Sequence, residues 1–157
     1  MLLWLKILLC GCSVAFCVML GYLAANRYRN RQKFYCQLYS FNERYLSELG
    51  YSRKPLPQFL IEYEYTGDFR KTLDLYSGRA DQLVPHTFLT EEERKECTDY
   101  FAMLGKGDAR SQSGFFSAQR APLAQKKEDC EKEAKARGAL YLKLGLLAGL
   151  AFVILII

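Results

Sequence analysis

Residues 7–25 read ILLCGCSVAFCVMLGYLAA, and none of these side chains is charged. The other end of the chain repeats the pattern, because residues 144–157 read LGLLAGLAFVILII and are also uncharged. About 20 helical residues cross the roughly 30 Å hydrocarbon core of a bilayer, so the first stretch is long enough to span it. The second becomes long enough if its helix begins near Gly138 and Lys143 extends its ammonium to the lipid headgroups. The two stretches predict a membrane hairpin that presents one small domain.

Each apolar stretch has an alternative interpretation. A signal peptide has a short apolar core before a small-residue cleavage site, whereas this run continues to Ala25. Residues 9–12, LCGC, resemble a lipoprotein cleavage box, but only a few apolar residues precede them. A core helix of a soluble protein would show a polar face, and residues 150–157 have none. A retained anchor and a second span are therefore favoured.

Basic residues beside the two spans predict the orientation of the hairpin. Four of them directly follow the first span: Arg27, Arg29, Arg31 and Lys33. Six more approach the second: Lys126, Lys127, Lys132, Lys135, Arg137 and Lys143. Lysine and arginine near spans are retained on the cytoplasmic side, so we expect a cytoplasmic domain with both termini across the membrane. Five of these residues are predicted to contact anionic lipid, at about 1 kcal/mol each: Arg27, Arg29, Arg31, Lys33 and Lys143.

The net charge of +5 has the same origin. Lys6, Lys143 and the four basic residues at 27–33 stand without an acid among them, and the remaining 16 basic and 17 acidic residues nearly cancel. A nucleic-acid surface would place a basic, aromatic-interleaved patch on the folded domain. Arg27-Tyr28-Arg29 has a little of that character, but it lies beside a span. The distribution favours a membrane surface and argues against nucleic acid as a partner.

The residues offer no catalytic or metal-binding constellation. The six cysteines form no CxxC pair, and His86 is the only histidine, so neither a zinc site nor a disulfide framework is predicted. Gly105-Lys106 lacks the upstream glycine and the hydroxyl of a phosphate-binding loop. Glu62 and Glu64 would act as an acid–base pair only if burial shifted one pKa, and they fit a solvated face better. We therefore expect a non-enzyme without cofactor or metal.

The periodicity of the middle domain is mostly helical. Apolar residues at steps of three and four predict one helix that ends at Gly50: Phe34, Leu38, Phe41, Tyr45 and Leu49. Pro57 opens a short helix through Tyr63, although alternation at 61, 63 and 65 leaves a short strand open. Another short helix carries Phe69, Leu73 and Tyr76. Residues 79–89 are predicted to form a loop with Pro85-His86 at its tip.

Two further helices complete the domain. Thr90 and Glu93 form a capping box for a helix that should bury Cys97, Tyr100, Phe101 and Leu104 before Gly105 ends it. Asp108 can cap a final helix, which Pro122 must kink or divide. Its apolar stripe holds Phe116, Leu123, Cys130, Ala134 and Tyr141. The predicted class is all-α: a transmembrane helix at 1–25, a cytoplasmic helical bundle at 26–139 and a transmembrane helix at 140–157.

The last third of the chain carries motifs of a known family. Residues 104–112, LGKGDARSQ, fit the pattern L-G-x-x-D-x-x-x-Q, and residues 143–150, KLGLLAGL, fit K-L-G-x-x-x-G-L. In these motifs and in its layout of two spans around a helical domain, the chain resembles the stage III sporulation protein AB family of endospore-forming bacteria. It differs from the family pattern in Pro122 and in its many tyrosines.

The resemblance implies a non-catalytic part of the transenvelope, secretion-like complex that connects mother cell and forespore during and after engulfment. It implies a place in the outer forespore membrane, on the mother-cell side, and a layout similar to platform proteins of type II secretion and type IV pilus systems. The implied partners are the hexameric ATPase, stage III sporulation protein AA, and other membrane components of the complex. Two other classes stay open: a membrane-anchored regulatory or sensor adaptor that binds a soluble cytoplasmic protein, and a minimal membrane enzyme.

Two sets of residues are predicted to make interfaces. Gly145 and Gly149 lie four apart and should let another helix approach closely, and the first span offers two small-residue pairs to match them. The candidates in the first span are Gly11 with Ala15 and Gly21 with Ala25, either within one chain or between copies in a homo-oligomer. The second set is the turn Gly105–Asp108 with Gln112. Asp108 has a sufficient role as an N-cap worth about 1 kcal/mol, whereas Gln112 suggests a partner surface or a polar contact between helices.

Overall fold

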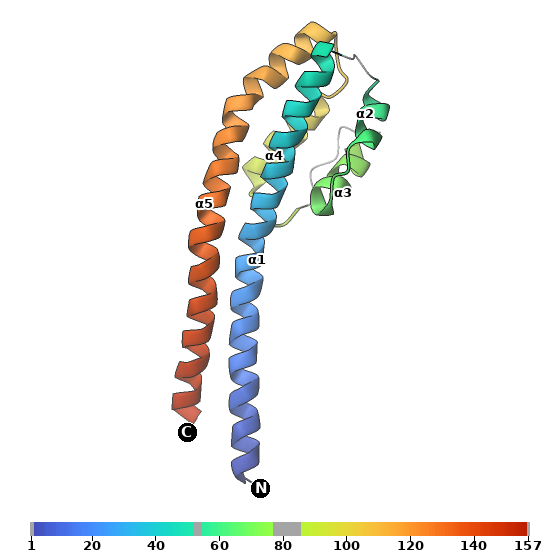
Figure 1. Cartoon of the computed structure of the whole chain (residues 1–157). Coiled ribbons are helices and arrows are strands. Elements are labelled where there is room, and N and C mark those ends of the chain that lie inside the picture. Colours follow the sequence, from blue (N-terminus) through green and yellow to red (C-terminus); the bar gives the residue numbers. More distant parts are fainter. Residues whose placement is uncertain (1, 52–54, 77–85, 157) are drawn as a thin grey trace. The chain divides into compact units, whose positions relative to one another are not determined.

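The computed structural model describes residues 2–51, 55–76 and 86–156 (Figure 1). Over these residues it contains five α-helices and no strand, which confirms the all-α class. They are α1 (Leu2–Tyr51), α2 (Leu56–Glu62), α3 (Gly67–Tyr76), α4 (Glu91–Ala102) and α5 (Ala109–Ile156). Contacts divide the chain into a hairpin unit, Met1–Asn30 with Cys130–Ile157, and a bundle unit, Arg31–Asp129. The boundaries between the two units fall inside α1 and α5.

The hairpin unit pairs the first part of α1 with the last part of α5, and their outer ends lie together (Figure 1). Its apolar side chains point outward: Leu9 is 55 % exposed, Leu147 61 % and Ile154 79 %. The most apolar 18-residue windows of the two helices have mean hydropathies of 2.3 and 1.6, and only 6 % and 17 % of them is buried. A soluble core helix would bury such a surface, so these two helices fit a two-pass membrane protein.

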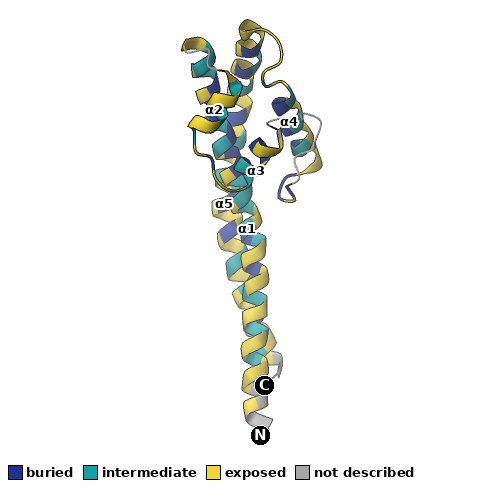
Figure 2. Cartoon of the chain, turned by 90° about the vertical axis from the view of Figure 1, so that its right-hand side faces the viewer, coloured by how far each residue is buried: buried dark blue, intermediate teal, exposed yellow. Residues whose placement is uncertain are grey.

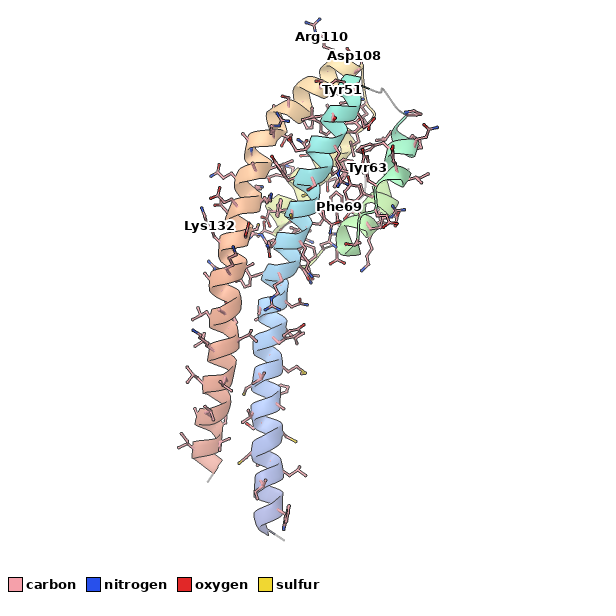
Figure 3. The ribbon with its side chains drawn as sticks, viewed as in Figure 1. Tyr51, Tyr63, Phe69, Asp108, Arg110 and Lys132 are labelled. Atoms are coloured by element: carbon pink, nitrogen blue, oxygen red, sulfur yellow. The ribbon has the colours of Figure 1, made fainter. Side chains whose placement is uncertain are left out.

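The core of the bundle unit is aromatic. Phe41 of α1 is fully buried, and five rings lie with their centroids 5.4–6.2 Å from its own: Tyr45, Phe59, Tyr65, Phe69 and Phe101. These rings come from four elements, α1, α2, α3 and α4, together with the turn after α2. Figure 2 shows the buried residues on the inner sides of these helices, and Figure 3 shows Phe69 among the packed side chains. Dense aromatic packing of this kind is what holds three short helices against α1.

Most of the predicted apolar stripes are confirmed. Four of the five residues predicted on the first helical face are buried, and Leu49 is half-buried. Cys97, Tyr100 and Phe101 of α4 are buried, whereas Leu104 is half-buried and lies beyond α4, which ends at Ala102 and does not reach Gly105 as predicted. On α5, Phe116, Leu123, Cys130 and Ala134 are buried. The capping box is also present, since Thr90 Oγ1 accepts a hydrogen bond from the Glu93 amide at 3.3 Å and Glu93 Oε2 accepts one from the Thr90 amide at 3.0 Å.

Another predicted helix end needs correction, and the structure decides between alternatives at two other places. α1 runs through Gly50 and ends at Tyr51, so the first span and the first bundle helix are one helix. The short segment before Tyr63 is helix α2, and the open alternative of a strand is wrong. Pro122 does not divide α5, which is continuous through it. Pro122 and Ala118 are both exposed, so the Ala118 carbonyl that lacks its helical N–H donor can be hydrated.

His86 lies in the predicted loop, since residues 86–90 form no helix or strand, but its environment differs from that of an exposed loop residue. The side chain is buried, with its ring stacked on Phe88 at 5.0 Å and lying edge-on to Phe34 at 5.5 Å. The aromatic ring therefore serves the core rather than the surface. Residues 79–85 of the expected loop, including Pro85, lie outside the described residues.

Candidate functional site

A buried polar residue that sequence reasoning missed ties three helices of the bundle unit together. Asn42 on α1 is fully buried, and its Nδ2 donates to the Phe116 carbonyl of α5 at 3.1 Å. Its Oδ1 accepts a hydrogen bond from the Tyr100 hydroxyl of α4 at 3.0 Å. Burial raises the pKa of the Tyr100 hydroxyl well above its usual value, so it stays a donor. The available signal was position: Asn42 follows Leu38 by four residues, on the apolar face.

Gln112 is the second buried polar residue of this kind. Its Oε1 accepts a hydrogen bond from the Tyr45 hydroxyl of α1, and its Nε2 donates to the Lys106 carbonyl at 3.2 Å. Burial raises the pKa of Tyr45, which keeps its hydroxyl protonated. Both functional groups of the Gln112 amide are thus used inside the bundle unit. Of the two explanations that the sequence left open, this geometry favours the polar contact between helices over a partner surface.

The other two residues of that predicted surface are exposed. Gly105 follows α4 with a φ of +71°, a conformation that favours glycine. Asp108 directly precedes α5, and its carbonyl accepts from the Gln112 amide at 3.1 Å. The hydrogen bond from the Ser111 hydroxyl, and then those from the first amides of α5, hold the pKa of Asp108 below its usual value. Asp108 therefore occupies the capping position of α5. It lies on the surface, as Gly105 does, whereas Gln112 is buried.

Gln112→Ala is expected to destabilise the bundle unit by about 1–3 kcal/mol, because the buried Tyr45 hydroxyl and the Lys106 carbonyl lose their partner. Each kcal/mol corresponds to a fall of roughly 4–8 °C in the unfolding midpoint of a domain of this size. The midpoint of the detergent-solubilised full chain, followed by near-UV circular dichroism, measures the change. Gln125→Ala removes an exposed glutamine from the same helix and should leave the midpoint unchanged. Equal midpoints for both variants would contradict the assignment.

His86 is the only histidine, and its environment makes it sensitive to pH. Its Nε2 lies 2.6 Å from Thr72 Oγ1, whose hydroxyl also lies 3.0 Å from the Asp68 carbonyl. Burial lowers the pKa of His86 below its usual value, because the charged ring would lose its hydration. The neutral ring is therefore the form that the folded chain keeps.

The stability of the bundle unit should consequently fall as the pH drops below about 6.5, the pKa of an unperturbed histidine. Below about pH 6.5 the His86 ring of the unfolded chain binds a proton, whereas the ring in the folded chain binds it only at a lower pH. The loss of stability therefore grows until the pH reaches the lowered pKa of His86. Glu93 adds its own loss only at lower pH, because its pKa is below the ordinary carboxyl value. Unfolding by denaturant at pH 7.5, 6.5 and 5.5 measures the slope. His86→Gln should remove it, and an unchanged slope in this variant would refute the prediction.

The predicted small-residue pairs of the spans fall into two groups. A Cβ atom at Gly21 would lie 2.7 Å from the Tyr141 carbonyl oxygen, and one at Gly145 would lie 2.8 Å from the Cys17 carbonyl oxygen. One at Gly149 would lie 3.1 Å from Cα of Val14, and Ala25 is fully buried. These four small residues face the opposite span of the same chain, where they allow the two backbones to approach closely.

Gly11 and Ala15 do not take part in that pairing. Nothing lies within 4 Å of a Cβ built at Gly11, and both residues are exposed. They line a shallow, almost wholly apolar groove of about 810 Å³ on the hairpin unit, together with residues such as Met19, Tyr22 and Val153.

The predicted lipid-contacting residues also divide into two groups. Arg27, Arg29, Lys33 and Lys143 are exposed. Arg31 instead contacts α4, with its Nη2 2.6 Å from Oε1 of Glu93, whose side chain is only 9 % exposed. Burial would raise the pKa of Glu93, but hydrogen bonds from Arg31 and from the Thr90 amide outweigh it and hold the pKa below its usual value. Arg31 therefore stabilises the bundle unit through a hydrogen-bonded pair.

The candidate catalytic residues are not assembled into a site. Glu62 and Glu64 are both exposed. Burial raises the pKa of the Cys97 thiol to about 12, so it remains protonated and is a poor nucleophile. Among the described residues, no group of three His, Cys, Asp or Glu side chains is placed to hold a metal ion. What the arrangement provides is a set of helix–helix contacts and exposed faces for other molecules.

Comparison with models of known families identifies the family of this chain. The model of the stage III sporulation protein AB family matches residues 68–157, which is more than half of the 157 residues. The chain belongs to the stage III sporulation protein AB family. The match includes α4 and α5, with the turn that holds Gly105 and Asp108, the buried Gln112 and the second span. Family membership implies a role in stage III of sporulation. No curated protein and no solved structure matches the chain.

Proposed function

We propose that this protein is a non-catalytic membrane component of the secretion-like complex between mother cell and forespore, and that it couples a cytoplasmic ATPase to that complex. The family match over residues 68–157 carries this proposal, because it covers most of the bundle unit together with the second span. The expected ATPase is of the stage III sporulation protein AA type, and other membrane components of the complex are the further partners.

The orientation needed for this function is supported by charge. Arg27 and Arg29 follow the first span, and Lys132 and Arg137 precede the second, all of them exposed. Positive residues at both inner ends favour a cytoplasmic bundle unit with both chain termini across the membrane. We place the protein in the outer forespore membrane on the mother-cell side. The exposed residues Arg27, Arg29, Lys33 and Lys143 are proposed to contact anionic lipid there.

The interior of the bundle unit suits a structural part better than a catalyst. Its buried polar side chains Asn42, Thr72, Glu93 and Gln112 all make hydrogen bonds that join elements of the bundle. Paired in this way, they fix one arrangement of the helices. A fixed arrangement presents the same exposed surface to a partner each time it binds, which is what a coupling protein requires.

Co-purification tests the proposal. The tagged full-length chain is solubilised from sporulating cells in mild detergent, and the ATPase encoded beside it is quantified in the eluate. We expect the ATPase to be retained, and a two-pass membrane protein of unrelated family with the same tag serves as the control. Loss of the ATPase while the membrane components stay bound would contradict coupling. Recovery of a soluble regulator in its place would favour the membrane-anchored adaptor.

A further inference from the structure

A groove of about 330 Å³ lies in the bundle unit between α1, α4 and α5. Its apolar surface is largely aromatic and comes from all three helices, with Tyr35 and Leu38 on α1, Tyr100 on α4, and Phe115 and Leu123 on α5. Its polar lining includes Glu96, Asp99, Gln119 and Lys126. Ligand pockets occupy about 300–1,000 Å³, so this one has room for a few side chains rather than for a large cofactor.

Lys126 shows that this groove can hold a positively charged group. The ammonium of Lys126 pairs with Glu96 and lies 5.8 Å from the centroid of the Tyr35 ring. A cation is thus held between a carboxylate of α4 and an aromatic face of α1, an arrangement in which both contacts are attractive. The groove therefore accepts positive charge beside an apolar floor.

The α4 wall carries more negative charge than Lys126 neutralises. Glu96 and Asp99 of the lining lie three residues apart on α4, in one stripe with Glu92, which is not part of the lining, and all three are exposed. Among the described residues, no lysine or arginine forms an ion pair with Glu92 or Asp99. Asp99 thus offers the groove a further acceptor for an incoming cation.

We propose that this groove, which we name the α4–α5 groove, docks a cationic, amphipathic segment of the partner ATPase. An apolar side chain of the segment enters the groove over Leu38 and Leu123, and a neighbouring lysine or arginine pairs with Asp99. Charge complementarity is the reason for choosing this occupant, since a neutral or acidic segment would leave the carboxylates of α4 unpaired or repelled. The inference rests on the proposed coupling to an ATPase and adds the place and chemistry of the contact.

Site-directed photo-crosslinking in sporulating cells tests the inference on the full-length chain. A photoreactive p-benzoylphenylalanine replaces Gln119, which lines the groove, or Gln125, which lies on the same helix but outside it. We expect Gln119, and not Gln125, to yield a crosslink to the ATPase. Mass spectrometry should place the crosslink in a segment that carries lysine or arginine beside apolar residues.

Charge reversal supplies an independent readout. Asp99→Lys changes an exposed residue, and we expect it to reduce the Gln119 crosslink roughly tenfold or more by placing a cation where the partner's cation binds. Glu91→Lys makes the same charge change on α4 away from the groove lining and should leave the yield unchanged. Equal near-UV circular dichroism spectra for both variants exclude unfolding as the cause.

The outcomes separate the inference from the proposed function. Full co-purification of the ATPase, together with no crosslink at Gln119 or a crosslink only to a second copy of this chain, would overturn the groove as the docking site and leave the coupling role standing. An acidic or wholly neutral crosslinked segment would overturn the stated chemistry. Absence of the ATPase from every preparation would refute the coupling role, and the inference would fall with it.

Discussion

Phe41→Ala is expected to lower the free energy of unfolding of the bundle unit by about 3–5 kcal/mol. Phe41 is fully buried, and its ring contacts one aromatic ring from each of α2, α3 and α4. Truncation leaves a cavity that these rigid rings cannot fill. Denaturant unfolding of the detergent-solubilised full chain, followed by near-UV circular dichroism, measures the loss. The single tryptophan, Trp4, lies in the hairpin unit, so its fluorescence would not report on the bundle.

Tyr51→Ala is the matched control for this substitution. Tyr51 is an aromatic residue of the same helix, but its side chain is 92 % exposed, so its removal should change the free energy by no more than about 0.5 kcal/mol. Similar losses for Phe41→Ala and Tyr51→Ala would mean that the aromatic core does not hold the bundle unit together.

Gly145→Ile is expected to separate the two spans of the hairpin unit. A Cβ at this position would lie 2.8 Å from the carbonyl oxygen of Cys17 and 3.5 Å from its carbonyl carbon. Both are backbone atoms, so the opposite helix must move rather than a side chain. Overpacking of this kind costs about 1–3 kcal/mol, which lowers the ratio of paired to unpaired spans at least about fivefold.

Oxidative crosslinking between native Cys10 and a cysteine introduced by Val153→Cys measures the pairing, because both positions line the same groove of the hairpin unit. The other five cysteines are replaced with serine. The crosslink should form in this background and fall sharply when Gly145→Ile is added. Ala148→Ile enlarges an exposed residue of the same helix and should leave the crosslink intact. An undiminished crosslink in the Gly145→Ile variant would show that the spans do not approach through this glycine.

The helices were predictable because their signals are local. Steps of three and four placed Phe34, Leu38, Phe41 and Tyr45 on one face of a helix. Thr90 and Glu93 have the spacing of a capping box, which marked the start of α4. The uncharged stretches at both ends likewise predicted the two long apolar helices from composition alone. Each of these features depends on residues within one or two helical turns.

What the sequence left undetermined depends on which helices meet. Asn42 and Phe116 are 74 residues apart, and Arg31 and Glu93 are 62 apart, so no local pattern distinguishes these residues from exposed polar ones. The burial of His86 likewise requires rings that precede and follow it in the chain, and its neighbourhood alone suggested a turn. These positions are fixed by tertiary packing, which overrides local preference.

The small residues of the spans illustrate the same limit. Gly11 with Ala15 and Gly21 with Ala25 have the same spacing, and the sequence offered no reason to choose between them. In the hairpin unit, the register of the two helices sets Gly21 against Tyr141 and Gly145, and leaves Gly11 open. Only the pairing of residues from opposite ends of the chain makes that distinction.

Fusions to alkaline phosphatase, which is active only outside the cytoplasm, test most directly whether the bundle unit lies where a cytoplasmic ATPase can reach it. We expect high activity for a fusion after position 157 and none for a fusion after Gly78, because the basic residues beside both spans hold the bundle unit inside. β-Galactosidase fused at the same two positions should give the opposite pattern, which confirms that all the fusions are expressed. High phosphatase activity after Gly78 and none after position 157 would place the bundle unit outside the cytoplasm and contradict coupling to an ATPase.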